Sequence, residues 1–411
     1  MRNLNLQIIR KAVLILCSLF FVLSSQSQEL ETLINEALAN SPEIQKFDLK
    51  YKIASEKVNE VNSLPNTEFN LGVMAVKPEM DMPMERFRVS VMQMLPWFGT
   101  ITARENYVSS VADAQYVKII IAKRNLMASV SEVYYNLYAN KAKQKVLTNH
   151  VQLLKTYETL ALTAVEIGKA SAVDVLRLQI RQNELRQLKD ELRQQFLAVQ
   201  TNLNKLLNRK HTVAITVVDS LIMPSEDFET PSENLAWHPE LLRYDKLYQS
   251  VEQSELLNQK EMAPMVGIGV EYISQENSPM ITSAYKDMVM PMLSVSIPIF
   301  NKKYRSQSKQ NELKQQEIST QKQERLNTLE THLAKAIRER IAARLSHETL
   351  IKNLQHAQNA EAMLLKSYET GTIDFKDILD IQELTLKFQI KQIEAVKAYY
   401  VQTTVINYLT Q

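Results

Sequence analysis

Long stretches without glycine or proline constrain this chain more than any other feature. Its 411 residues include only 6 Gly and 12 Pro, and neither residue occurs in 100–167, 169–223, 299–370 or 372–411. Because Gly and Pro most strongly disfavour a helix interior, each stretch is free to form one long helix. A helix over 100–167 alone would be about 100 Å long at about 1.5 Å per residue. The pattern argues against an ordinary globular enzyme and predicts a long helical rod or tunnel.

Residues 1–27 read as a secretory signal peptide. Arg2, Arg10 and Lys11 form a basic start, the apolar core over 12–23 is too short to span a bilayer stably, and 25–27 is a small-x-small cleavage site. The alternative is an uncleaved anchor helix. Cleavage would change the formal net charge from +2 to −1 by removing three basic residues and no acidic one. That charge gives no bulk basic patch, so we expect no nucleic-acid partner.

The sequence lacks the usual signs of catalysis. Its single cysteine, Cys17, lies inside the apolar core of the proposed signal, so disulfides, thiolate metal sites and cysteine nucleophiles are excluded from the mature chain. The six histidines form no His-x-His or His-Glu-x-x-His pattern, and the chain has no phosphate loop and no nucleophile elbow. We therefore expect a protein that is not an enzyme and that carries no cofactor.

Two halves of the chain repeat the same plan. Matching segments occur in the same order, namely 39–44 with 236–241, 95–98 with 297–300, and 168–179 with 371–382. After the signal, the first repeat covers 28–231 and the second covers 232–411. The first contains an opening helix (29–62), strands within 66–96, a helix hairpin (100–208), and an equatorial strand (212–219) followed by a linker. The second contains an opening helix (232–262), strands within 264–299 and a helix hairpin (301–409).

The strand segments alternate between apolar and polar residues, as half-buried strands do. Phe69, Leu71 and Val73 share one face of the first, and Gly267 and Gly269 lie opposite the aliphatic residues of the third. Four such strands of about 10 residues are long enough to cross a bilayer when tilted. The alternative is a pair of hairpins packed on a soluble core.

Four strands cannot close a membrane barrel, and open sheet edges are not tolerated in lipid. Two copies of the chain would supply eight strands and little lumen, whereas three would supply twelve and a usable channel. The predicted fold class is therefore mainly α, with long antiparallel coiled-coil helices and four β-strands per chain contributing to a 12-stranded trimeric membrane barrel.

At this point the chain resembles the TolC family of outer-membrane efflux and secretion channels. The most specific marks are the two helix-turn-helix tips at 166–176 and 368–380, together with the duplication and the four strands. The resemblance implies a homotrimer in the outer membrane of a Gram-negative bacterium, in contact with its lipid and continued by a periplasmic helical tunnel. It also implies a passive export conduit that works with a periplasmic adaptor and an inner-membrane pump, in the multidrug or the heavy-metal branch.

The resemblance assigns the tips to adaptor contact. The turns are at Gly168 and Gly371, and the neighbouring contact residues are Val173 and Ile373. Glycine suits the left-handed backbone position that ends a helix. The family often has a basic residue at the position of Ile373, so its absence argues against a salt-bridged lock there.

The resemblance also places a periplasmic gate near these tips. Asp377 and Asp380 would face the pore as acidic rings, and Tyr368 and Asp174 would belong to the contacts that hold the gate closed. The two aspartates are three residues apart and therefore share a helix face. Six carboxylates near one axis would repel each other, favour cations and respond to pH. The alternative is the ordinary preference of a helix first turn for acidic residues.

Methionine is concentrated in or directly beside the strand segments, where 12 of the 16 in the chain lie. Thioethers are soft ligands suited to Cu(I) or Ag(I), which would fit the copper and silver branch of the family. The candidate soft-metal contacts are Met80, Met82, Met84, Met92, Met94, Met288, Met290 and Met292. The alternative is that methionine serves as a flexible apolar filler. In addition, a twelve-stranded lumen would hold facing sulfurs too far apart to share an ion.

Two other functions fit part of the pattern. A type I protein secretion channel would have the same architecture, because cargo specificity usually lies in the pump. A periplasmic coiled-coil adaptor would share the long helices, but it would show a lipoyl-like β domain with many glycines. The four alternating strands therefore favour a channel.

Overall fold

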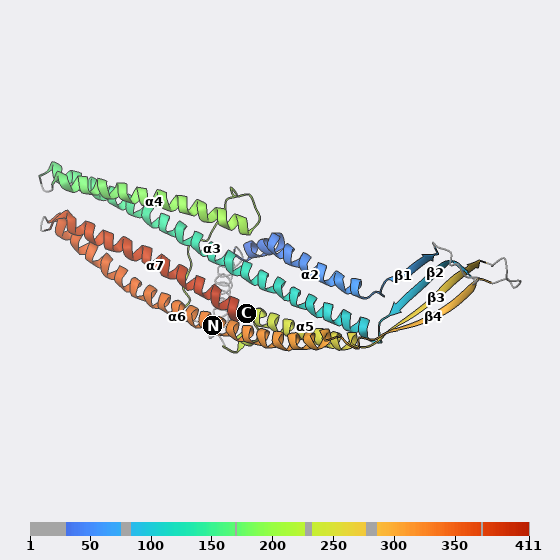
Figure 1. The fold of residues 1–411 in the computed structure, drawn as a ribbon. Coiled ribbons are helices and arrows are strands. Elements are labelled where there is room, and N and C mark those ends of the chain that lie inside the picture. The colour runs from blue at the N-terminus through green and yellow to red at the C-terminus, as the bar shows by residue number, and fades with distance from the viewer. Residues whose placement is uncertain are drawn as a thin grey trace, which may run out of the picture. The chain divides into compact units, whose positions relative to one another are not determined.

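The computed structural model describes residues 30–74, 84–168, 171–226, 232–276, 286–370 and 373–410, and the proposed signal at 1–27 lies outside them. Residues 30–40 are helical. The elements that follow are α2 (Pro42–Val61), β1 (Thr67–Val73), β2 (Met84–Leu95), α3 (Thr100–Glu166), α4 (Ala172–Leu206), η1 (Ser232–Trp237), α5 (Pro239–Glu261), β3 (Met265–Glu276), β4 (Met288–Ser296), α6 (Lys303–Glu369) and α7 (Phe375–Thr410) (Figure 1). No helix in this described part has both the length and the apolar character of a membrane span.

The chain divides into two compact units. One unit contains the described parts of 1–45, 121–238 and 327–411, and the other contains the described parts of 46–120 and 239–326. In the first unit, α3 pairs with α4 and α6 pairs with α7 as helix hairpins (Figure 1). These helices confirm the prediction drawn from the stretches without Gly and Pro. At one hairpin end Gly168 has a φ of 70°, and Ser171 caps α4 by accepting a hydrogen bond from the backbone N–H of Val173.

Buried apolar residues at a seven-residue spacing form the core of the first unit, which we call the helical unit. Buried residues recur at this spacing as Leu147, Leu154 and Ala161 on α3, as Leu178, Leu185 and Leu192 on α4, and as Leu329, Ala336, Ala343, Leu350 and Ala357 on α6. A strict seven-residue apolar repeat is the pattern of a coiled coil, in which side chains of one helix fill holes on its partner. Phe375 and Ile378 of α7 join the same core as the α3 and α4 residues.

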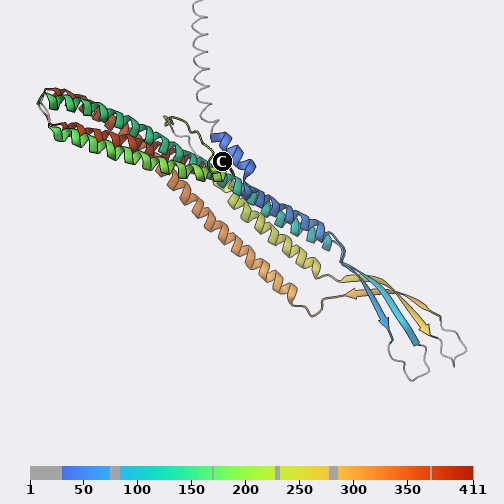
Figure 2. The same cartoon turned by 90° about the horizontal axis from the view of Figure 1, so that it is seen from above.

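The second unit contains a four-stranded antiparallel sheet in the order β1-β2-β3-β4 (Figure 2). The strand prediction is confirmed for all four segments. In the register, Met92 of β2 lies opposite Gly269 of β3, which in turn lies opposite Met292 of β4. Among the described residues, the strand ladders contain one register shift, between Glu85 and Phe87.

Polar contacts hold α5 beside the neighbouring helices of this unit. The carboxylate of Glu255 accepts hydrogen bonds from Ser308 Oγ at 2.7 Å and Asn311 Nδ2 at 2.8 Å, both on α6. Arg104 of α3 forms an ion pair with Glu261 of α5 at 3.1 Å. Hydrogen-bonded polar layers of this kind specify which helix faces meet, because each group would be costly to bury alone.

The two opening helices are shorter than predicted. A break at Ser41 separates residues 30–40 from α2, and η1 and His238 precede α5. The helix α2 begins at Pro42 and α5 begins at Pro239. Proline has no N–H for an upstream helical bond but fits the first helical position. Ser41 Oγ accepts from the backbone N–H of Ile44 at 3.4 Å and so caps α2.

The predicted equatorial strand at 212–219 is wrong for this chain, because residues 213–218 form no strand. Their backbone groups are instead satisfied by helix side chains. Lys141 Nζ donates to the carbonyl of Val217 at 2.8 Å, and Asn204 Nδ2 donates to the carbonyl of Val213 at 2.8 Å. The segment alternates as a strand would, but helices rather than a strand edge lie beside it.

Candidate functional site

The sheet has one apolar face that is open to its surroundings. Because side chains alternate across a strand, the register places the large apolar residues of all four strands on the same side. The exposed members are Phe69, Leu71, Val73, Phe87, Ile268, Val270, Val289, Leu293 and Val295. The most exposed of them, Leu293, retains 74% of its accessible surface. A continuous exposed apolar patch of this kind marks a surface that meets a partner or a membrane.

Aromatic side chains border this face where the strands join the helices. Phe98, just after β2, is 86% exposed, and its repeat counterpart Phe300, just after β4, is 97% exposed. Trp97 is also exposed. Gly99 has a φ of 79° and ends the turn before α3, with the backbone N–H of Thr100 donating to the carbonyl of Trp97 at 3.0 Å. Aromatic residues at the edge of an apolar surface are typical of a membrane–water interface.

The opposite face of the sheet carries charge and hydroxyl groups. Arg88 pairs with Glu85 at 2.9 Å and with the buried carboxylate of Glu271, across the β2–β3 ladder, at 3.3 Å. Asn70 Nδ2 donates to Ser90 Oγ at 3.4 Å. The two faces therefore differ in chemistry as the alternation of the sequence predicts.

Five of the predicted methionine contacts lie on this polar face. They are Met92 and Met94 on β2 and Met288, Met290 and Met292 on β4. Met80 and Met82 lie outside the described residues, and Met84 begins β2 but its side chain is not among those described.

The predicted gate aspartates are accessible at the start of α7. Asp377 and Asp380 are both exposed, and the backbone N–H of Asp377 donates to the carbonyl of Asp374 at 3.2 Å. Of the predicted adaptor-contact residues, Val173 is 51% exposed, whereas Ile373 is partly buried against the hydrophobic core. Gly371 lies outside the described residues.

Tyr368 and Asp174, which we predicted to belong to the contacts that hold the gate closed, each contact a different residue. Among the described residues, the buried hydroxyl of Tyr368 has no hydrogen-bond partner, and its ring packs edge-on against Phe375 at 5.1 Å. Burial, and secondarily the charge of Asp174, raise the pKa of Tyr368. Asp174 forms its ion pair with Arg177, on its own helix, at 3.4 Å. The two groups are therefore neighbours without a direct bond.

Another tyrosine links the two hairpins. Tyr157 of α3, only 4% exposed, donates its hydroxyl to a carboxylate oxygen of Glu361 on α6 at 2.5 Å. Its ring also contacts Phe375 at 6.0 Å. Burial and the hydrogen bond to Glu361 raise the pKa of Tyr157. The offset that matches Gly168 with Gly371 also matches Glu158 with Glu361, so the repeat draws attention to Glu361 but not to its partner Tyr157.

Glu158 has a polar role of its own in the first hairpin. It accepts hydrogen bonds from Gln179 and Gln182 of α4 at 2.8 and 2.7 Å. These bonds lower the pKa of Glu158. Deeper in the same unit, the buried His150 contacts Gln389 of α7 through Nε2 at 2.8 Å, and burial lowers the pKa of His150.

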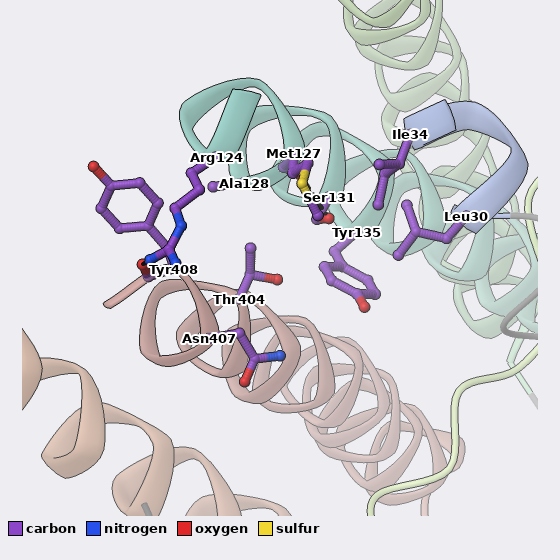
Figure 3. Close-up of a pocket in the computed structure, with 10 residues that line it drawn as sticks. All are labelled: Leu30, Ile34, Arg124, Met127, Ala128, Ser131, Tyr135, Thr404, Asn407 and Tyr408. Atoms are coloured by element: carbon purple, nitrogen blue, oxygen red, sulfur yellow. Dashed lines mark hydrogen bonds between the residues drawn. The ribbon is translucent and has the colours of Figure 1, made fainter. Parts of the chain in front are cut away.

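A cavity of about 400 Å³ opens in the helical unit. Figure 3 shows its lining drawn from the first helical segment, α3 and α7, namely Leu30, Ile34, Arg124, Met127, Ala128, Ser131, Tyr135, Thr404, Asn407 and Tyr408. The walls are mostly apolar, and burial lowers the pKa of the Arg124 guanidinium. The described lining contains no carboxylate, and no group of three or more His, Cys, Asp or Glu in the described chain could hold a metal ion.

Solved structures of outer-membrane channels match this fold. The chain is 13% identical to CusC, covering 93% of this chain and 92% of that chain at a TM-score of 0.77. It is 15% identical to the outer-membrane protein VceC of Vibrio cholerae, with 93% and 96% covered and a TM-score of 0.76. It is 14% identical to the MtrE outer-membrane channel of Neisseria gonorrhoeae, with 93% and 88% covered and a TM-score of 0.73. No protein-family model and no curated protein matches the sequence.

Proposed function

We propose that this chain is a subunit of an outer-membrane channel, the passive export conduit of a tripartite efflux system. The two-faced sheet is the observation that carries the proposal. One face is aliphatic and aromatic and is bordered by the exposed rings of Phe98 and Phe300, while the other holds the Arg88–Glu271 pair. Lipid on the first side and water on the second satisfy both faces. A soluble adaptor would leave the apolar face uncovered in water.

The channel is a trimer in this proposal. The outer edges of the sheet are β1 and β4, and a sheet in lipid must pair its edges with other strands. Three copies supply twelve strands, enough for a water-filled lumen. The long helices also leave large apolar side chains exposed in the single chain, among them Ile180, Leu345 and Met363, which neighbouring copies would cover.

The gate and the partner contacts lie at the hairpin ends. Exposed carboxylates of Asp377 and Asp380, repeated three times about one axis, would form a cation-favouring constriction. The Tyr157–Glu361 hydrogen bond ties the first hairpin to the second, so movement of one hairpin for opening must break it. Val173, exposed beside the Gly168 turn, belongs to the surface that a periplasmic adaptor contacts when adaptor and inner-membrane pump open the channel.

Disulfide cross-linking tests this arrangement. Because Cys17 lies in the proposed signal and is the sequence's sole cysteine, the variant Asp377→Cys carries a single thiol in the mature chain. In outer-membrane fractions we expect oxidation to join two of three protomers into a disulfide-linked dimer, which a reductant should return to monomer on a denaturing gel. The control is Lys57→Cys, an exposed position on α2 outside the hairpins, which should stay monomeric on denaturing gels. Recovery of Asp377→Cys as an uncross-linked soluble monomer would reject the proposal.

A further inference from the structure

Two glycines open a gap among the methionines on the polar face of the sheet. Gly267 and Gly269 belong to β3, the strand between the methionine-bearing strands β2 and β4. Met94 lies opposite Gly267, while Met92 and Met292 lie on either side of Gly269. Since glycine has no side chain, no side chain of β3 at these two positions stands between the methionines of the flanking strands.

The sulfur atoms occupy the space that the glycines leave. A Cβ added at Gly267 would lie 2.5 Å from Sδ of Met94 and 3.1 Å from Sδ of Met92. A Cβ added at Gly269 would lie 2.6 Å from the backbone carbonyl oxygen of Val91 and 3.1 Å from Sδ of Met92. Two thioether sulfurs of one chain therefore converge over Gly267, and any side chain there would push at least one of them away. Both methionines are partly buried rather than free on the surface.

We propose that Met92 and Met94 form a binding site for a soft monovalent cation, Cu(I) or Ag(I), with Met292 as a third thioether ligand. Thioethers select soft cations over Mg²⁺ or Ca²⁺, which require oxygen ligands. The site lies within one protomer, so it does not require sulfurs to meet across a wide lumen. The absence of side chains at Gly267 and Gly269 lets the methionine sulfurs come together close to the sheet.

The site indicates that soft monovalent cations are a cargo of the proposed channel. A weak soft-metal site on the water-facing side of the sheet would hold the cation on its way through, with exchange among the thioethers of successive strands. This cargo role rests on the proposed function, whereas binding of the ion rests only on the β2–β3–β4 juxtaposition.

Silver binding to the purified full-length protein in detergent tests the site. Equilibrium dialysis against Ag(I) in nitrate buffer, with bound silver measured by mass spectrometry, should show saturable binding of one ion per protomer. The double variant Met92→Leu/Met94→Leu keeps side-chain volume, so the fold should survive while affinity falls at least about tenfold. The matched control is Met127→Leu/Met262→Leu, which changes two exposed methionines outside the sheet and should leave binding unchanged.

A second variant keeps the test independent of the leucine changes. Gly267→Ala should also weaken silver binding, because the added methyl group occupies the position beside both sulfurs. Equal binding by the wild type and the Met92/Met94 variant, or no saturable binding by the wild type, would overturn the site. Bilayer conductance separates the two proposals. A conducting protein that binds no silver refutes the metal site alone, and a silver-binding protein without conductance refutes the channel alone.

Discussion

Placing a charge on one face of the sheet and then on the other tests which surface meets lipid. Leu293 lies on the apolar face of β4, and Ser294, the next residue, lies on the polar face beside Gly267. The variants Leu293→Arg and Ser294→Arg add the same side chain at nearly the same depth. They differ in the face that receives it, so their comparison cancels effects common to any arginine in this strand.

The size of the difference follows from the position of Leu293 near the middle of β4, which runs from Met288 to Ser296. An arginine facing lipid near the bilayer midplane costs about 2–4 kcal/mol in a membrane β-structure. At about 1.4 kcal/mol for each factor of ten, this is a loss of about 30- to 700-fold in the folding equilibrium of one protomer. Ser294→Arg should cost about 0.5 kcal/mol or less, because its guanidinium stays in water.

Reversible unfolding in urea from lipid vesicles measures the difference, and the amount of folded protein in outer-membrane fractions gives a second readout. We expect Leu293→Arg to shift the urea midpoint strongly downward while Ser294→Arg stays near the wild type. If Ser294→Arg were as costly as Leu293→Arg, or more so, the assignment of the apolar face to lipid would be refuted.

Two further predictions concern the helical unit. Tyr157→Phe removes the hydroxyl that donates to Glu361, so it should lower the free energy of unfolding in urea by about 1–3 kcal/mol. The control Tyr116→Phe, at an exposed ring, should change that free energy little. Equal losses of stability in the two variants would exclude a specific Tyr157–Glu361 bond between the hairpins. Burial lowers the pKa of His150 below its usual 6.5, so the unfolded chain binds a proton more readily than the folded chain as pH falls. Stability should therefore decline below about pH 6.5, and the His150→Gln variant should show a smaller decline between pH 8 and pH 5; an unchanged pH dependence would contradict this role.

The long helices and the strands could be predicted from sequence because each depends on a local signal. Missing helix breakers over 100–167 permit α3, and alternation over the strand segments sets the two faces of the sheet. The segment at 213–218 has the same alternation but no strand beside it. Its backbone bonds to Lys141 and Asn204 depend on tertiary placement, which residue pattern alone does not determine.

The candidate sites divide in the same way. The spacing of Asp377 and Asp380 predicts that they share a helix face, and the structure exposes both. The partner of Tyr368 depends on how two hairpins pack, and the structure gives that tyrosine an aromatic neighbour. The seven-residue repeat and the equivalence of Glu158 and Glu361 in the two halves of the chain can both be read from the sequence. Convergence of two sulfurs over Gly267 cannot be read in this way, because alternation gives the face of each residue but not its cross-strand neighbour.

Single-channel recording in planar lipid bilayers tests the channel most directly. The purified wild-type protein should produce discrete conductance steps, and its reversal potential in a salt gradient should show a preference for cations. The variant Asp377→Asn/Asp380→Asn should keep the steps and lose that preference, because it removes the carboxylates proposed to ring the constriction. A folded, membrane-inserted protein that gives no steps, or cation preference unchanged by the double substitution, would contradict the proposed channel or its gate.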